Sequence, residues 1–341
     1  MQKTNLSSRR VGFFLRFYGR KTFTFLTKWR IVYNMEEIKQ ENLMETVGGT
    51  PPTLQEKEKS TVWKGVFFLI LSAFFFSLMS LFVRLSGNLP TFQKAFFRNI
   101  IATIAAAVVL ARSKSFKMKK GSLPDLLLRS VTGAVGVVCN FYAIDKMNIS
   151  DASILNKLAP FFTVIFSIII LKEKASWKDW LFVGIAFVGA VFVVKPSKDI
   201  ASSLPALIGV LGGLGAGMAY TFVRKLGQRG ERKAYIVFFF SLFSTIVMLP
   251  PMIIQYQPML WWQVLVLLAA GCMAAGAQFS LTAAYSYAPA KSISVYDYTQ
   301  VLFTALWGLM FLSELPDLIS IIGYVIIIGA AVLKWLTSRK K

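Results

Sequence analysis

The sequence predicts an all-α membrane protein of ten transmembrane helices, built as a 5+5 inverted repeat with the N- and C-termini in the cytoplasm. Three observations predict it: apolar blocks of about twenty residues, positive charge concentrated in alternate connections, and a match between the two halves. The chain has 341 residues, 55% of them hydrophobic, and a mean hydropathy of +0.59. Soluble domains average about 45–50% apolar residues. A helix of about 20 residues spans the roughly 30 Å of hydrocarbon in a bilayer.

Ten apolar blocks follow one another closely from Trp63 onward. Clusters of Pro, Gly and charged residues separate them, as at residues 86–90 and 121–124. Pro lacks the backbone N–H that a helix needs, and Gly is conformationally free, so such clusters are typical of helix ends. We expect spans near residues 63–83, 92–111, 125–144, 151–171, 177–194, 204–224, 234–254, 262–284, 292–312 and 318–336.

Residues 1–60 differ from the rest of the chain. Up to Asn34 there are eight Lys or Arg residues and no acid, interleaved with aromatic residues. This stretch is either a segment that lies on the membrane surface or sequence that precedes a true start at Met35 or Met44. Residues 36–60 are polar and contain Gly and Pro, which is typical of a disordered cytoplasmic leader.

The net charge of +22 is explained by the places where Lys and Arg lie. Cytoplasmic loops of membrane proteins are enriched in these residues. With the N-terminus inside, the cytoplasmic connections hold eighteen: Arg112, Lys114, Lys117, Lys119, Lys120, Lys172, Lys174, Lys178, Arg224, Lys225, Arg229, Arg232, Lys233, Lys291, Lys334, Arg339, Lys340 and Lys341. The opposite connections hold four: Arg84, Lys146, Lys195 and Lys198. The basic character therefore predicts a lipid bilayer as partner and no nucleic acid.

The two halves of the chain resemble each other. A shift of 141 residues lays Ser153, Phe162, Thr163, Leu171 and Glu173 on Ser294, Phe303, Thr304, Leu312 and Glu314. We expect a first repeat over residues 61–198 and a second over 199–341. Because each repeat holds an odd number of helices, the second must be inverted in the membrane relative to the first. Inverted repeats place a binding site near the midplane and permit alternating access.

Three of the charged residues inside predicted spans stand out: Arg98, Lys157 and Asp297. A charge there costs roughly 2.5–3.5 kcal/mol on insertion scales, so such residues normally face a cavity or a partner. We expect all three to line a substrate cavity. Asp297 is the candidate for proton coupling, because desolvation raises the pKa of a carboxyl group. Two cations and one carboxylate favour an anionic or zwitterionic substrate.

Further polar residues lie at similar depth, and we expect them in the same cavity: Asn140, Tyr142, Asn156, Gln278 and Tyr298. Pro160 interrupts the backbone hydrogen bonds in mid-span and is the candidate hinge. For the Ser and Thr residues that share its helix face, hydrogen bonds between helices, worth about 0.6 kcal/mol each, are the favoured interpretation. Glu173 and Glu314 have two interpretations, a surface carboxylate paired with Lys172 or Lys174 and a coupling group.

Several classes of site are disfavoured. The chain has no His, and Cys139 and Cys272 lie in apolar stretches typical of packing positions, so we expect no metal site and no cofactor. The Gly-rich run at residues 209–217 is not followed by Gly-Lys-Ser/Thr, so it is not a phosphate loop and instead favours close helix packing. No nucleophile with a base and no metal-spaced acids are visible, which disfavours an enzyme.

Two segments resemble the EamA-type repeat of the drug/metabolite transporter superfamily. They run from Asp151 through Glu173 and from Tyr296 through Glu314. In that family a Glu commonly closes the fourth helix of each repeat, and the Gly-containing segments 184–194 and 323–332 resemble its fifth and tenth helices. The resemblance implies a ten-helix carrier with a central cavity, whose relatives carry amino acids, drugs, nucleotide sugars and other metabolites.

These observations together predict a secondary active transporter of a small metabolite in the cytoplasmic (inner) membrane. A non-transporting scaffold or sensor subunit is the main alternative, and a membrane-embedded enzyme is a weaker one. The chain is compatible with a monomer or a homodimer.

Overall fold

The structure is a computed structural model and describes residues 54–113, 117–146, 149–195, 204–312 and 315–339. The chain divides into two units, residues 1–58 and 59–341, and the second holds nearly all of the described residues. The described residues form helices and connecting segments, with no strand among them. Most of the expected leader, including Met35 and Met44, lies outside the described residues. The first described helix begins at Leu54, nine residues before the span expected from residue 63.

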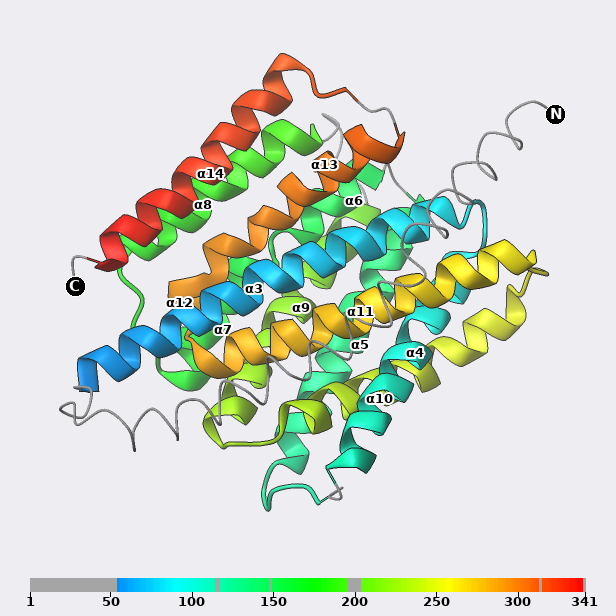
Figure 1. Cartoon of the computed structure of the whole chain (residues 1–341), viewed down its shortest axis with the longest axis horizontal. Helices are drawn as coiled ribbons and strands as arrows, with labels where there is room; N and C mark the ends of the chain where they lie inside the picture. Colours follow the sequence, from blue (N-terminus) through cyan, green and yellow to red (C-terminus); the bar gives the residue numbers. More distant parts are fainter. Residues whose placement is uncertain (1–53, 114–116, 147–148, 196–203, 313–314, 340–341) are drawn as a thin grey trace, which may run out of the picture. The chain divides into compact units, whose positions relative to one another are not determined.

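The helices follow the expected spans closely (Figure 1). They are α3 (Leu54–Leu85), α4 (Thr91–Arg112), α5 (Leu123–Lys146), α6 (Ile149–Asn156), α7 (Ala159–Leu171), α8 (Trp177–Val194), α9 (Leu204–Gln228), α10 (Lys233–Ile254), α11 (Trp261–Tyr287), α12 (Ala290–Ile293), η2 (Ser294–Tyr298, a 3-10 turn), α13 (Thr299–Leu312) and α14 (Leu318–Arg339).

Eight segments in the described part of the chain are long and apolar enough to cross a membrane. The other two expected spans are not among these eight. One is helix α5, which has 24 residues. Helix α13 has only 14 residues because a 3-10 turn precedes it. Eight spans are therefore supported by length and composition, and the count of ten stays a prediction.

The fourth and ninth expected spans are broken rather than continuous, which corrects the sequence prediction. Helix α6 ends at Asn156 and α7 begins at Ala159, with Pro160 in the first turn of α7. Pro160 has no N–H to donate to the carbonyl of Asn156, and its ring clashes with that carbonyl, so the helix stops there. The break lies just before the expected hinge residue. In the ninth span, η2 separates α12 from α13.

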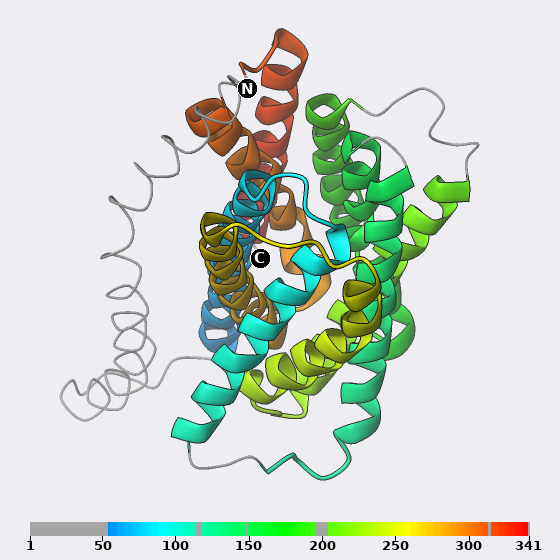
Figure 2. The same ribbon diagram turned by 90° about the vertical axis from the view of Figure 1, so that its right-hand side faces the viewer.

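Three helix pairs organise the second unit: α5 packs on α9, α4 on α10, and α8 on α14 (Figures 1 and 2). By the 141-residue shift, α4 corresponds to α10 and α8 to α14. Two helices of the first repeat therefore lie against their own counterparts in the second. Contacts of this kind arise where a two-fold relation between repeats passes through the packed helices.

The Gly-rich run of α9 brings backbones into direct contact, as expected for a packing role. A Cβ on Gly213 would lie 2.8 Å from the carbonyl oxygen of Leu155, and one on Gly217 would lie 2.5 Å from Cβ of Phe162. A Cβ on Gly215 would meet the carbonyl oxygen of Thr132 at 2.8 Å. Only glycine permits such an approach, so this run holds α5, α6 and α7 around α9.

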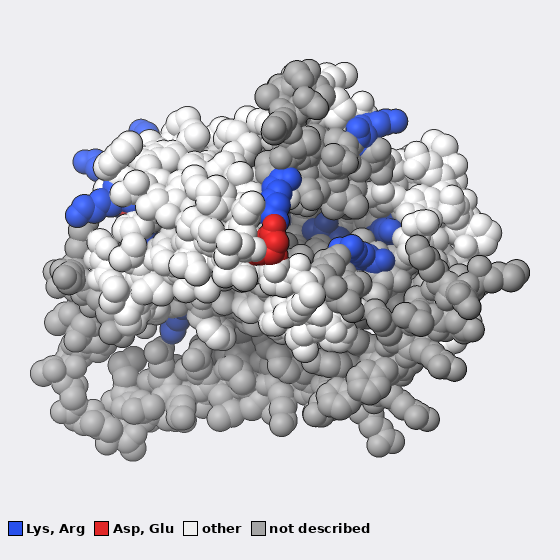
Figure 3. All heavy atoms as spheres, turned by 90° about the horizontal axis from the view of Figure 1, so that it is seen from above, with Lys and Arg blue, Asp and Glu red and all other residues white. Residues whose placement is uncertain are grey.

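Large apolar side chains cover much of the outer surface. Ile169 is 65% exposed, and Phe67, Ile246 and Ile253 are exposed to a similar extent. Figure 3 shows one face on which uncharged residues predominate and basic side chains are scattered. A soluble protein rarely exposes so much contiguous apolar surface, whereas a membrane protein presents it to lipid.

Candidate functional site

The breaks in the fourth and ninth spans are joined by an ion pair. Lys157 lies between α6 and α7, and its Nζ donates hydrogen bonds to Oδ2 of Asp297 at 3.2 Å and to Oε1 of Gln300 at 2.7 Å. The hydroxyl of Tyr298 donates to the carbonyl oxygen of Lys157 at 2.9 Å. The Lys157 and Asp297 side chains are 11% and 13% exposed. Three candidates from two breaks far apart in sequence therefore meet in one buried group.

Each break contributes to this group through its backbone. The chain leaves the α-helical path after Asn156, so the carbonyl of Lys157 is available to Tyr298 rather than to the next turn of helix. In η2 the consecutive residues Asp297 and Tyr298 both bond to Lys157, one to its side chain and one to its backbone. Tyr298 is fully buried, with its ring 6.5 Å from that of Phe187. Asp297, which we expected to be a desolvated carboxylate, has the cation of Lys157 beside it.

A second group contains two arginines on neighbouring helices, Arg98 in α4 and Arg129 in α5. The guanidinium of Arg129 lies 3.8 Å from the ring centroid of Phe240, and Nη2 donates to Oε1 of Gln278 at 3.3 Å. Arg98 is partly buried, with Cζ 5.9 Å from the ring centroid of Phe76. In both arginines Nε is buried without a hydrogen-bond partner.

Tyr220 of α9 is coupled to both groups. It interacts electrostatically with Arg98, Arg129 and Asp297, and its ring stacks on that of Tyr285 at 5.3 Å. Helices α4 and α5 belong to the first expected repeat, whereas α9, α11 and η2 belong to the second. The charged residues therefore gather where the halves meet.

Three other candidates are placed differently. Asn140, Tyr142 and Asn156 are partly buried in α5 and at the end of α6. Among the described residues, no hydrogen bond joins their side chains to either charged group. Arg129 was missed by the sequence reasoning, although the signal used for Arg98, a charge inside an apolar span, applies to it equally.

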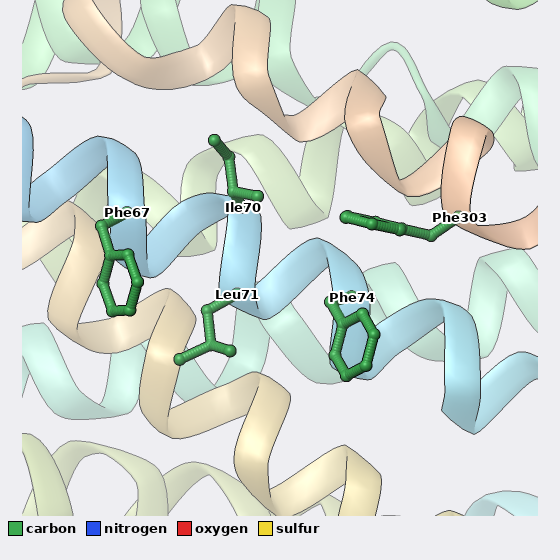
Figure 4. Close-up of a pocket in the computed structure, with 5 residues that line it drawn as sticks. All are labelled: Phe67, Ile70, Leu71, Phe74 and Phe303. Carbon is green, nitrogen blue, oxygen red and sulfur yellow. The ribbon is translucent and has the colours of Figure 1, made fainter.

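One pocket of about 320 Å³ lies on a different part of the molecule (Figure 4). It is lined by Phe67, Ile70, Leu71, Phe74 and Phe303. These residues come from α3 and α13, and Phe74 and Phe303 meet edge to face at 5.5 Å. The lining is wholly apolar, so this pocket has no group that could recognise a charged metabolite.

Comparison with known proteins identifies the family. The EamA-like transporter family matches residues 63–195 and again residues 203–335. The chain belongs to the EamA-like transporter family. It is 34% identical over 270 residues to the pseudopaline exporter CntI of Pseudomonas aeruginosa, covering 79% of this chain and 94% of the exporter. It is also 26% identical to solute carrier family 35 member G1 of Homo sapiens, covering 81% of each chain.

A solved crystal structure shares the fold, with a TM-score of 0.71 at 15% identity, over 83% of this chain and 98% of that one. The EamA-like chain is therefore a multi-pass membrane protein with two repeated domains, and its relatives are transporters rather than enzymes.

In this EamA-like chain Glu173 joins the two repeats, which corrects the expected pairing with Lys172 or Lys174. Its Oε1 accepts from Nε of Arg224 at 3.0 Å, and its Oε2 accepts from Oγ of Ser167 at 2.5 Å. Lys172 has a φ of 56°, and this left-handed residue turns the chain so that Glu173 points back toward α9. Glu314, its expected counterpart, lies outside the described residues.

Replacing Glu173 with Gln should lower the free energy of unfolding by about 1–2 kcal/mol, because the pair is largely shielded from water. Lys174→Gln is the matched control, since the Lys174 contact that the structure gives uses its backbone carbonyl. Thermal unfolding of the two variants in detergent measures the difference. Equal stabilities would show that Glu173 has no partner beyond its sequence neighbours.

At the other ends of the helices, Lys195 after α8 and Asp317 before α14 form an exposed pair with Nζ 2.5 Å from Oδ1. The hydrogen bond from Lys195, helped by the backbone N–H of Ser320, lowers the pKa of Asp317 from 3.8 to about 2. A carboxyl group with a lowered pKa stabilises the fold above its unfolded pKa and loses that effect as the pH falls through its folded pKa.

Asp317→Asn should therefore unfold at a lower temperature than the unsubstituted protein at neutral pH, by a small and salt-sensitive margin. The margin should stay constant down to about pH 4 and vanish as the pH falls to about 2. Unfolding temperatures of both proteins across this pH range measure it. A margin that disappears already between neutral pH and about pH 5 would contradict the assignment.

Proposed function

We propose that this protein is a secondary active transporter that moves a small anionic or zwitterionic metabolite across the cytoplasmic membrane by alternating access. The functional unit in this proposal is a 5+5 inverted repeat of ten spans. The repeats cover residues 61–198 and 199–341, and both termini lie in the cytoplasm. One observation carries the proposal: the pair of Lys157 with Asp297 joins the broken spans of the two halves.

The repeat relation supports a central position for this pair. Lys157 and Tyr298 correspond to each other under the 141-residue shift, and they touch through a hydrogen bond of 2.9 Å. Two equivalent positions can meet only near the axis that relates the repeats. In an inverted repeat that axis lies in the membrane plane, which is where carriers of this kind bind their substrates.

Depth along the helices supports the same position. Lys157 lies eight residues after the start of α6 at Ile149, and Asp297 lies seven after the start of α12 at Ala290. At about 1.5 Å per residue these are roughly 10–12 Å from opposite faces of a hydrocarbon core of about 30 Å. Chains entering from opposite faces can make contact at these positions only close to the midplane.

Contacts between helix ends agree with the proposed topology. Lys195 and Asp317 form a pair, and the ten-span arrangement puts both on the outer side. Glu173 and Arg224 form another, and the arrangement puts both on the cytoplasmic side. Such pairs across the two repeats would break and form as the halves rock. A substrate that inserts between Lys157 and Asp297 would shift this equilibrium by its differential affinity for the two states.

Asp297 is the proposed coupling group, since protonating it would release Lys157. We propose export as the direction, because the relative CntI is named an exporter. Each chain contains both halves of the pathway, so a homodimer would hold two pathways.

Flux through purified protein in liposomes, loaded with a metabolite extract and analysed by mass spectrometry, tests the proposal. We expect at least one anionic or zwitterionic compound to cross at a rate that Lys157→Met abolishes. Gly184→Ala is the folded control, since a Cβ there meets nothing within 4 Å. No flux of any compound through folded protein would favour the scaffold or sensor alternative.

A further inference from the structure

Arg98 and Arg129 have no acidic partner among the residues that the structure describes. Six acids have described side chains, and each is engaged elsewhere. Asp125 pairs with Lys225 and Arg229, Glu173 with Arg224, Asp179 with Lys334, Asp297 with Lys157 and Asp317 with Lys195, and Glu231 accepts from the backbone of Lys119 and Arg232. The two guanidinium groups therefore keep their full charge in the middle of the protein.

The positive charges of these two arginines are energetically costly at their buried positions. Arg129 is 2% exposed, and its contacts are a neutral amide oxygen of Gln278 and the ring of Phe240. Arg98 and Arg129 also repel each other, since they interact electrostatically across the α4–α5 contact. A buried charge is normally paired, and an apolar residue of similar size is usually at least as stable in its place. Packing alone does not explain two arginines here.

The unsatisfied hydrogen-bond donors indicate which kind of partner the two arginines lack. Nε of Arg98 and Nε of Arg129 are both buried hydrogen-bond donors without an acceptor. Guanidinium groups present planar donors that match the two oxygens of a carboxylate or the oxygens of a phosphate. The missing partner is thus an oxyanion that none of the described side chains supplies.

We infer that Arg98 and Arg129 form the subsite that binds the carboxylate or phosphate group of the transported metabolite. The inference rests on the proposed function and narrows it, because a substrate without an oxyanion would leave both arginines unpaired. The amide of Gln278, which accepts from Arg129, and Tyr220, which interacts electrostatically with both arginines, are further polar groups of the subsite.

The neighbouring pair adds a second feature to the subsite. Lys157 and Asp297 neutralise each other, so the two arginines leave the region with an excess of two positive charges. Tyr220 interacts electrostatically with both the arginines and Asp297. An oxyanion bound to the arginines would offset this excess charge, and its own charge can act on the Lys157–Asp297 pair as Tyr220 acts on both groups.

The experiment measures thermal unfolding of full-length protein in nanodiscs of neutral phosphatidylcholine. The probes are the anionic and cationic fractions of a bacterial metabolite extract, separated on an anion-exchange resin at alkaline pH and added at equal ionic strength. The anionic fraction should raise the unfolding temperature of the unsubstituted protein, since a ligand stabilises the state that binds it. The cationic fraction should leave it unchanged.

Variants assign the effect to the arginines. Arg98→Met and Arg129→Met should each lose the response to the anionic fraction, and Arg129→Lys should retain part of it. Lys178→Met removes an exposed cation at the start of α8 and should respond like the unsubstituted protein. Without ligand, Arg129→Met should unfold at no lower temperature than the unsubstituted protein, whereas loss of a purely structural arginine would lower it. If Arg129→Met does not fold, the responses of Arg98→Met and Arg129→Lys to the anionic fraction test the inference.

Three outcomes would overturn the inference: no response to the anionic fraction, a response that both Met variants retain, and a response to the cationic fraction alone. A lipid headgroup is the other source of an oxyanion. If nanodiscs containing phosphatidylglycerol stabilise the protein through Arg98 and Arg129 while soluble anions do not, the subsite belongs to lipid and the inference fails.

Liposome flux distinguishes failure of the oxyanion subsite from failure of the proposed transport function. Flux of neutral or cationic compounds only, with no response to anions, would leave transport standing and remove the oxyanion subsite. An arginine-dependent response to anions, with no flux of any compound, would leave the subsite standing and remove the transport proposal.

Discussion

Replacing Asp297 with Ala should stop transport and lower the free energy of unfolding by about 3 kcal/mol. The substitution leaves the ammonium of Lys157 largely buried, with the amide of Gln300 as its remaining hydrogen-bond partner among the described residues. Breaking a buried pair by removing one partner typically costs about 3–5 kcal/mol, because the remaining charge is uncompensated. The slight exposure of both side chains puts the expected value at the lower end. Chemical unfolding in detergent and liposome flux measure the two effects.

The double variant Lys157→Met/Asp297→Leu separates stability from function. Removing both charges leaves no buried ion, so its unfolding free energy should return to within about 1 kcal/mol of the original. Transport should remain absent, because the element that responds to substrate is gone. A double variant that transports at the original rate would show that the pair only holds the two breaks together.

The spans were predictable because apolar length is a local property of the sequence. Nearly every helix boundary falls within a few residues of the expected one, apart from the earlier start of α3. The break before Pro160 had a local signal in the proline itself. The 3-10 turn at Ser294–Tyr298 had none, since all five residues are buried and their path is set by the packing of α7, α8 and α14 around them.

The partners of the charged residues were not predictable in the same way. Lys157 and Asp297 were recognised as costly charges, but their contact joins positions 140 residues apart and depends on two breaks. For Glu173 the sequence left two interpretations, a pair with its sequence neighbours and a coupling role, whereas the structure shows a pair with Arg224 after the left-handed Lys172. A charge inside a span can be recognised from the sequence as energetically costly. Its partner depends on which helices pack together.

Replacing Gly323 with Ala should separate α14 from α8 and destabilise the protein by about 2 kcal/mol. An added Cβ would lie 2.6 Å from the carbonyl oxygen of Gly189 and 2.8 Å from Cγ2 of Val193. The contact is reciprocal, since a Cβ on Gly189 would lie 2.9 Å from the carbonyl oxygen of Gly323. Backbone cannot rotate away as a side chain can, so the helices must move apart. Such overpacking typically costs about 1–3 kcal/mol.

Gly329→Ala is the control in the same helix, because a Cβ there meets nothing within 4 Å. Ala is favoured over Gly inside a helix by roughly 0.5–1 kcal/mol, so this variant should be neutral or more stable. The two variants make the same chemical change and differ only in what the new methyl group meets. Moving α14 also strains the pairs of Lys195 with Asp317 and of Asp179 with Lys334, which join α8 to α14 at both ends. Equal unfolding temperatures for the two variants would mean that the close backbone contact contributes nothing to holding the two repeats together.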